Sequence, residues 1–219
     1  MHNITLISTS HKENGKCNAE ELHKIIEAMY PEVIFLEALE SSYTKYDHLK
    51  FSQFGVYNER LEINAIQKYN QNHPFEYVPV LDNGLSEEFD KKLNVVCNHN
   101  EYQKLIDIHK SLAMKYGFQY LNSEKSIQLH EKMRELGNHI LSNNEICKKS
   151  DESIDAYENS MIRNIYAYCK DNLFNKAIFM CGSAHRKSII EKIENYKTED
   201  NLKLNWTFLE VDMLFNSIK

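Results

Sequence analysis

One sequence pattern, which occurs near both ends of the chain, constrains the fold most. Residues 4–7 form a short apolar run that is followed by three small residues and His11. Residues 177–181 form a second apolar run, which is followed by Gly-Ser-Ala and His185. Apolar strands that alternate with helical patterns are typical of parallel sheets. Ligands bind outside the carboxyl ends of such strands, so we expect both histidines to lie at a binding site.

The first of these units continues into a second strand. Asn18 and Glu21 have the spacing of a helix N-cap, and apolar residues at helical spacing follow them. Residues 33–36 then form an uninterrupted apolar run that leads to Glu37. We predict a strand–helix–strand unit with a right-handed crossover. Its two strands end near His11 and at Glu37, so both side chains are expected at the same edge of the sheet.

Two more segments have the character of edge strands. Residues 75–81 read as a third strand that ends at Asp82, and Pro79 favours a bulge or an edge position because it cannot donate to a strand ladder. Residues 204–211 alternate between apolar and polar side chains, which is typical of a strand exposed on one face. The sequence therefore predicts a three-layer α/β fold with a mostly parallel central sheet.

Helical periodicity dominates the middle of the chain. Residues 59–69 are predicted to form one helix, and residues 153–173 a long helix that leads into the strand before His185. From about 85 to 150 we expect several inserted helices that cover the site edge of the sheet. Residues 43–57 are rich in Tyr and Phe and are interpreted as a pocket lid or a subunit contact. Residues 1–219 are predicted to form a single α/β domain.

Composition and charge exclude several classes of function. With 219 residues, of which 42% are hydrophobic, the chain can bury one substantial core. The net charge is -6 and lysines are scattered among acidic residues, so no nucleic-acid partner is expected. We expect neither a signal peptide nor a membrane span, because no apolar stretch approaches the roughly 20 residues that a span needs. Five cysteines without a Cys-x-x-Cys pair indicate reduced thiols, and hence a cytoplasmic location.

His11, Glu37 and His185 form a candidate ligand set, because two imidazoles and a carboxylate suit a divalent metal with open positions. His185 is expected in the first turn of a helix, where the positive end of the dipole keeps the ring neutral. A neutral ring can bind a metal or act as a general base. Two structural alternatives stay open: Ser183 caps the helix that follows it, and Glu37 extends from the strand into solvent. The other eight histidines are predicted to lie in solvent: residues 2, 23, 48, 73, 99, 109, 130 and 139.

Four motifs in a fixed order resemble a known superfamily. They are Ser8-Thr-Ser-His11, Phe35-Leu-Glu37-Ala, Tyr157-Glu158-Asn-Ser-Met161-Ile-Arg-Asn164-Ile165 and Gly182-Ser-Ala-His185. The chain is similar in this pattern to TraB/Tiki-type proteins, to erythromycin-esterase-like hydrolases and to ChaN-like haem-binding lipoproteins. It departs from the pattern at two positions, because Ser8 replaces a Gly and Tyr157 replaces an Arg. Arg163 and Arg186 are candidates to supply the missing guanidinium in space.

The resemblance implies hydrolysis of an amide or ester bond in a small-molecule or peptide substrate. By this reading His11, Glu37 and His185 hold a divalent metal (Mn, Co or Zn). These three residues and Glu158, which shares a helical face with Met161, are the expected catalytic residues. The residues expected to contact the substrate are Ser10, Ser183, Asn164 and Arg163.

The same resemblance leaves three alternatives open. In the first, hydrolysis is metal-free: His11 or His185 activates water as a general base, and Glu37 and Glu158 orient it. In the second, the chain is a non-enzymatic module that binds a small ligand or haem. In the third, it is a member that has lost its chemistry.

Overall fold

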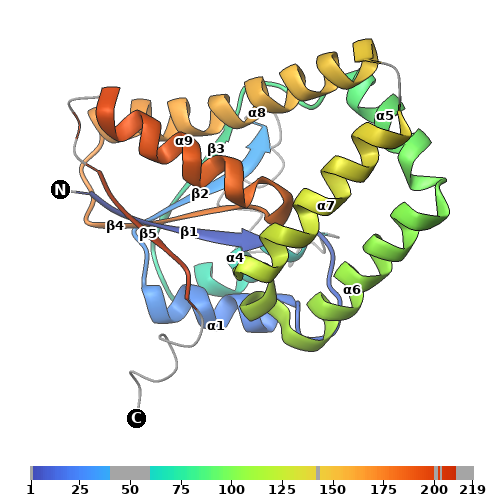
Figure 1. Cartoon of the computed structure of the whole chain (residues 1–219). Helices are drawn as coiled ribbons and strands as arrows, with labels where there is room; N and C mark the ends of the chain where they lie inside the picture. The colour runs from blue at the N-terminus through green and yellow to red at the C-terminus, as the bar shows by residue number, and fades with distance from the viewer. Residues whose placement is uncertain (1, 40–59, 142–143, 200–201, 203, 211–219) are drawn as a thin grey trace.

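The computed structural model describes residues 2–39, 60–141, 144–199, 202 and 204–210. The prediction of a lid or subunit contact at residues 43–57 lies outside these residues. Five parallel strands form one sheet in the order β3-β2-β4-β1-β5 (Figure 1). The strands are β1 (His2–Thr9), β2 (Val33–Leu39), β3 (Glu76–Leu81), β4 (Lys176–Gly182) and β5 (Leu204–Phe208). The predicted three-layer α/β fold is thus confirmed, and β3 and β5 are the two edge strands.

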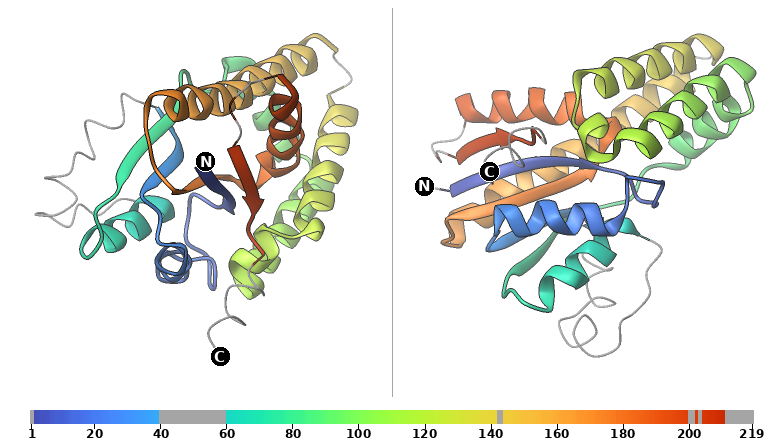
Figure 2. Two further views of the ribbon diagram at one scale, coloured as in Figure 1. Left: turned by 90° about the vertical axis from the view of Figure 1, so that its left-hand side faces the viewer. Right: turned by 90° about the horizontal axis from the view of Figure 1, so that it is seen from below.

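Helices cover both faces of the sheet, which explains why the central strands are apolar without interruption. On one face, α1 (Ala19–Met29) and α4 (Leu61–Asn70) pack against a core that includes Ile7 and Ile34. On the other face, α8 (Asn144–Asp171) and α9 (Arg186–Glu199) pack against a core that includes Leu6 and Phe35. Neighbouring residues of one strand therefore pack into different cores. Figure 2 shows the sheet between the two helical layers.

The start of α1 follows the predicted capping. The side chain of Asn18 accepts a hydrogen bond of 2.9 Å from the backbone N–H of Glu21. The start of α8 was predicted wrongly, since this helix begins at Asn144 and not at residue 153. The first two turns of α8 are rich in charged residues, which are good helix formers but lack the apolar stripe that sequence periodicity detects.

Three helices extend beyond the carboxyl end of β1. They are α5 (Glu87–Cys97), α6 (Asn100–Leu121) and α7 (Glu124–Ile140), and they form an arm next to the strand ends (Figure 1). A sharp change of backbone direction interrupts α6 at Gly117, where φ is 55°. A Cβ atom there would lie 2.6 Å from the backbone oxygen of Lys16, so only glycine allows the arm to approach the loop after β1 this closely. Within the described ranges, no helix combines the length and the apolar character that crossing a bilayer requires.

Candidate functional site

His11, Glu37 and His185 lie together at the carboxyl edge of the sheet. His11 follows β1, and Glu37 lies near the carboxyl end of β2. His185 is the last residue of a short 3-10 helix, η1 (Ser183–His185), which follows β4. Because β4 lies between β2 and β1, the three strand ends are neighbours. The Nε2 atoms of His11 and His185 are 3.9 Å and 3.7 Å from the same oxygen, Oε1 of Glu37. We call these three residues the histidine–glutamate centre.

A further carboxylate contacts Nδ1 of each histidine of the centre. Nδ1 of His11 is 3.0 Å from Oε1 of Glu62, and Nδ1 of His185 is 2.8 Å from Oε1 of Glu158. Both carboxylates are buried, with exposed fractions of 1% for Glu62 and 2% for Glu158. An ionised carboxylate can only accept a hydrogen bond, so Nδ1 carries the proton in both rings. Nε2 of each ring is therefore the atom available for chemistry.

The sequence pattern indicated Glu158 but not Glu62. Glu158 lies on the face of α8 that was expected to point toward the site. Glu62 belongs to the first turn of α4, between Leu61 and Ile63, which are fully buried. A carboxylate inside such an apolar stretch is the signal that could have identified it, because an acidic side chain is rarely fully buried without a partner.

Glu37 is held by two donors. The hydroxyl group of Tyr157 donates to Oε1 at 2.7 Å, and the backbone N–H of Gly182 donates to Oε2 at 2.6 Å. Burial strongly raises the pKa of Tyr157, and the charge of Glu37 adds to this effect, so the phenol remains a donor. A Cβ atom at Gly182 would lie 3.4 Å from Oε2 of Glu37 and 3.8 Å from Nε2 of His11. Gly182 therefore lies directly against the centre, and its lack of a side chain leaves room for Glu37 and His11.

The pKa of both histidines of the centre is raised. For His11, the hydrogen bond to Glu62 outweighs burial, which lowers the pKa. For His185, burial lowers the pKa, but the hydrogen bond to Glu158 and the charges of Glu37 and Glu158 outweigh it. The raised pKa runs against the prediction that a helix dipole disfavours the charged form of His185. Full carboxylate charges at 2.8 Å and 3.7 Å exceed the partial charge of a helix terminus.

Two of the residues expected to contact the substrate form hydrogen bonds at the carboxyl end of β3. The guanidinium of Arg163 pairs with Asp82 at the end of β3. Nδ2 of Asn164 donates to Oδ1 of Asp82 at 2.7 Å and to the backbone oxygen of Val80 at 3.2 Å. These bonds hold α8 against β3, and they give both side chains a structural role there.

Among the described residues, Arg163 and Arg186 have hydrogen-bond partners other than the histidine–glutamate centre. Arg186 is buried, and its Nη1 donates to Oγ of Ser8 at 3.1 Å and to Oδ1 of Asn122 at 2.9 Å. The cation next to Glu37 is instead Arg60, which precedes α4 and places Nη1 3.4 Å from the backbone oxygen of Glu37. Sequence reasoning missed Arg60, because nothing in the pattern links its segment to the strand end.

The prediction that the other histidines lie in solvent is wrong for His2, which is buried, and for four partly buried residues, His23, His73, His109 and His130; His48 lies outside the described residues. Nδ1 of His2 is 3.0 Å from the backbone oxygen of Phe174 in a buried setting. Nε2 of His130 on α7 is 3.0 Å from Oγ of Ser183, a residue expected to contact the substrate. Burial, together with the charges of His109, His185 and Arg134, lowers the pKa of His130 to about 3.

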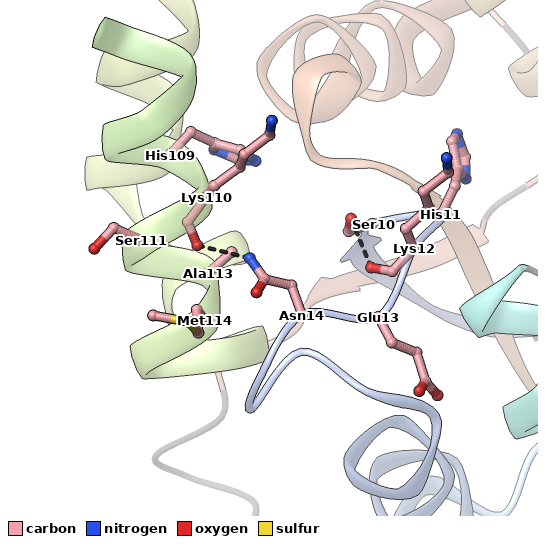
Figure 3. A pocket seen from close by; sticks show the side chains of 10 residues that line it. All are labelled: Ser10, His11, Lys12, Glu13, Asn14, His109, Lys110, Ser111, Ala113 and Met114. Carbon is pink, nitrogen blue, oxygen red and sulfur yellow. Dashed lines mark hydrogen bonds between the residues drawn. The ribbon is translucent and has the colours of Figure 1, made fainter.

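A pocket of about 790 Å³ adjoins the centre and shares His11 with it. Ser10, the remaining residue expected to contact the substrate, also lines this pocket, and its hydroxyl group donates to the backbone oxygen of Lys12. Figure 3 shows the two walls, which are the loop after β1 and a segment of α6. The lining residues are Ser10, His11, Lys12, Glu13, Asn14, His109, Lys110, Ser111, Ala113 and Met114. Its volume falls in the range of small-molecule sites.

The donor set of the centre fits a divalent cation in chemistry and charge. Nε2 of His11, Nε2 of His185 and Oε1 of Glu37 are common metal ligands, and each ring has the supporting carboxylate that metal-bound histidines usually have. In the described part of the chain, no group of three or more His, Cys, Asp or Glu side chains already has metal-site geometry. The separations of 3.7 Å and 3.9 Å exceed by only a few tenths of an ångström the about 3.4 Å between tetrahedral ligands.

Comparisons with protein-family models, with curated proteins and with solved structures find no match to this chain. Its function must therefore be inferred from the chemistry of the centre and the adjoining pocket.

Proposed function

We propose that this chain hydrolyses an ester or amide bond, with water activated at the histidine–glutamate centre. One observation carries the proposal: two imidazole Nε2 atoms face one buried carboxylate oxygen, and a separate buried carboxylate orients each ring. A purely structural histidine needs neither a free Nε2 nor a second histidine that faces the same oxygen. The adjoining pocket offers room for a substrate next to His11.

The two histidines are suited to general acid–base chemistry. The carboxylates raise the pKa of both rings, but a positive charge on His11 lowers the pKa of His185. The pair therefore accepts a first proton more readily than a second, and the form with one neutral and one charged ring is the one suited to this chemistry. The neutral ring takes a proton from water through Nε2, and the charged ring gives its proton to the leaving group.

Exposure suggests which ring does which task. The side chain of His11 is 42% exposed and lines the pocket, whereas that of His185 is 14% exposed. His11 is placed to take the proton from an entering water molecule. His185, deeper and close to Glu37 and Glu158, holds the proton that the leaving group receives. Tyr157 keeps Glu37 oriented between the two rings.

A metal-assisted form uses the same residues. His11, His185 and Glu37 would hold a divalent cation (Mn, Co or Zn), and both rings would then be neutral. Three buried carboxylates, Glu37, Glu62 and Glu158, favour a positive charge at this place. A bound cation lowers the pKa of water and polarises a carbonyl group.

The first test compares hydrolysis of p-nitrophenyl esters and aminoacyl p-nitroanilides by purified variants. We expect His185→Gln and Glu37→Gln to lose at least about 100-fold in kcat/KM, as is usual when a general acid or base is removed. His139→Gln is the matched control, because His139 is exposed on α7. Equal hydrolysis by the wild type and both centre variants would overturn the proposal.

Metal content decides between the two forms. About one equivalent of a transition metal in the wild type, and none in the His11→Ala/His185→Ala double variant, would establish the metal-assisted form. Activity that survives EDTA and does not rise with Mn, Co or Zn would establish the metal-free form.

A further inference from the structure

The pocket beside the centre is preformed, because its two walls are tied to each other. Nδ2 of Asn14 donates to the backbone oxygen of Lys110 at 2.8 Å, and the backbone N–H of Lys16 donates to the backbone oxygen of Met114 at 2.9 Å. Gly15 between them has a φ of +57°, and a Cβ atom there would lie 2.5 Å from Met114. Only glycine allows this contact, so the loop after β1 can pack directly against α6.

Two lysines line this pocket, one on each wall. Lys12 lies on one wall and Lys110 on the other, and neither ammonium group forms an ion pair with a described residue. Oε1 of Glu13, the acidic residue in the lining, accepts a hydrogen bond from the backbone N–H of Ala19 at 2.9 Å. Figure 3 shows the Glu13 carboxylate directed away from Lys110 and His11. Its negative charge therefore lies at the N-terminus of α1, where it interacts favourably with the helix dipole.

The pocket also has an apolar part. Met114 is 51% exposed although its side chain is apolar, and Ala113 beside it is buried. Burial lowers the pKa of His109 on the same wall, which keeps that ring neutral. A ligand that fills this space therefore meets apolar surface along α6 and a cation on each side.

The carboxylates of the centre set the orientation of such a ligand. Glu37 and Glu62 lie behind His11, and they repel a negatively charged group that approaches the centre. The anionic end of the ligand is thus directed to the Lys110 wall, and the neutral part lies next to His11.

We propose that this pocket binds an organic anion, a carboxylate or phosphate on an apolar body, and so selects the substrate of the centre. The role in substrate selection rests on the proposed hydrolysis, whereas the binding of the anion does not. The chain carries a net charge of -6, so this preference is local and opposes the overall charge of the protein.

The test is calorimetric titration of the full chain at low salt with three probes. These are 4-phenylbutyrate, its neutral analogue 4-phenylbutanamide, and phenylphosphonate. We expect the wild type to bind the two anions three- to tenfold more tightly than the amide, because exposed ion pairs are individually weak and two cations act here. Tighter binding of phenylphosphonate than of 4-phenylbutyrate would assign the site to phosphate, and the reverse order would assign it to carboxylate.

Two double variants with the same net charge identify the site. Lys12→Gln/Lys110→Gln removes the cations of the pocket, and we expect it to bind the anions and the amide equally. Lys104→Gln/Lys132→Gln removes two exposed cations elsewhere on α6 and α7 and should keep the full preference. Equal affinity of the wild type for acid and amide, or a preference that survives in the Lys12/Lys110 variant, would overturn the proposal.

Binding and hydrolysis can fail separately in this design. His185→Gln should lose hydrolysis but retain the anion preference, because His185 does not line the pocket. If the wild type shows the preference but hydrolyses none of the chromogenic substrates, the anion site stands and the proposed function falls. If it hydrolyses neutral and anionic substrates with equal KM, the role in selection is wrong.

Discussion

Replacement of Glu158 by Gln tests whether a buried carboxylate sustains a charged imidazole at the centre. Glu158 is 2% exposed, and its Oε1 is 2.8 Å from Nδ1 of His185. Its other oxygen accepts a hydrogen bond from the hydroxyl group of Ser188. An amide oxygen at the same place still accepts from Nδ1, so the variant removes the charge and keeps the shape.

The size of the effect follows from the type of bond. A hydrogen bond to a charged partner contributes about 1.5–3 kcal/mol, compared with about 1 kcal/mol for a neutral one. Carboxylates raise the pKa of His185 above its ordinary value of 6.5 against the effect of burial. The stabilisation is therefore complete below pH 6.5 and is lost as the pH rises through the folded-state pKa. We expect Glu158→Gln to lower the free energy of unfolding by about 1–2 kcal/mol at pH 5.5.

The assay is urea denaturation of the EDTA-treated protein at pH 5.5 and at pH 9, together with an NMR titration of the His185 ring. Loss of the ring proton at higher pH removes the ion pair, so the difference in stability should be smaller at pH 9 than at pH 5.5. Glu191→Gln is the matched control, because Glu191 is exposed on α9. The reasoning is refuted if Glu158→Gln destabilises equally at both pH values, or if the pKa of His185 does not fall.

Three further variants give expected outcomes that urea denaturation can check. Tyr157→Phe removes the donor to Oε1 of Glu37 and should cost about 1.5–3 kcal/mol at pH 7; no loss would show that Glu37 does not need this donor. Lys92→Met, which removes the buried ammonium that bonds to Asp151 at 2.9 Å, should cost about 1–2 kcal/mol and loosen α5 from α8; an unchanged midpoint would contradict this. Because the folded-state pKa of His130 is about 3, wild-type stability should fall as the pH decreases from 6.5, by up to about 1.4 kcal/mol per pH unit. His130→Asn should flatten this slope, and equal slopes would place the acid sensitivity elsewhere.

The position of the centre could be predicted from the sequence because it depends on short-range rules. Apolar runs that end at a histidine or glutamate identify strand ends, and parallel strands bring their carboxyl ends to one edge. These rules place His11, Glu37 and His185 together, as the structure does. Glu158 follows from helical periodicity within α8, which fixes its direction relative to Met161 and Ile165 on the core side.

The partners that depend on how separate helices dock could not be predicted in the same way. Glu62 meets His11 only because the start of α4 lies against the loop after β1, where the backbone N–H of Leu61 donates to the oxygen of His11. His130 meets Ser183 only because α7 packs on η1. Periodicity shows which face of a helix is apolar, but it does not show which strand end that face will meet.

A tyrosine rather than an arginine at position 157 leaves that position of the centre without a permanent charge. An arginine at that position would add a permanent cation beside Glu37, whereas the phenol of Tyr157 adds one hydrogen bond and no charge. Glu37, Glu62 and Glu158 are all buried, and Nη1 of Arg60 donates a hydrogen bond to the backbone oxygen of Glu37. Protons on His11 and His185, or a bound cation, would add positive charge next to these carboxylates. Both proposed forms of the hydrolase supply such a charge, and the same carboxylates raise the pKa of both histidines.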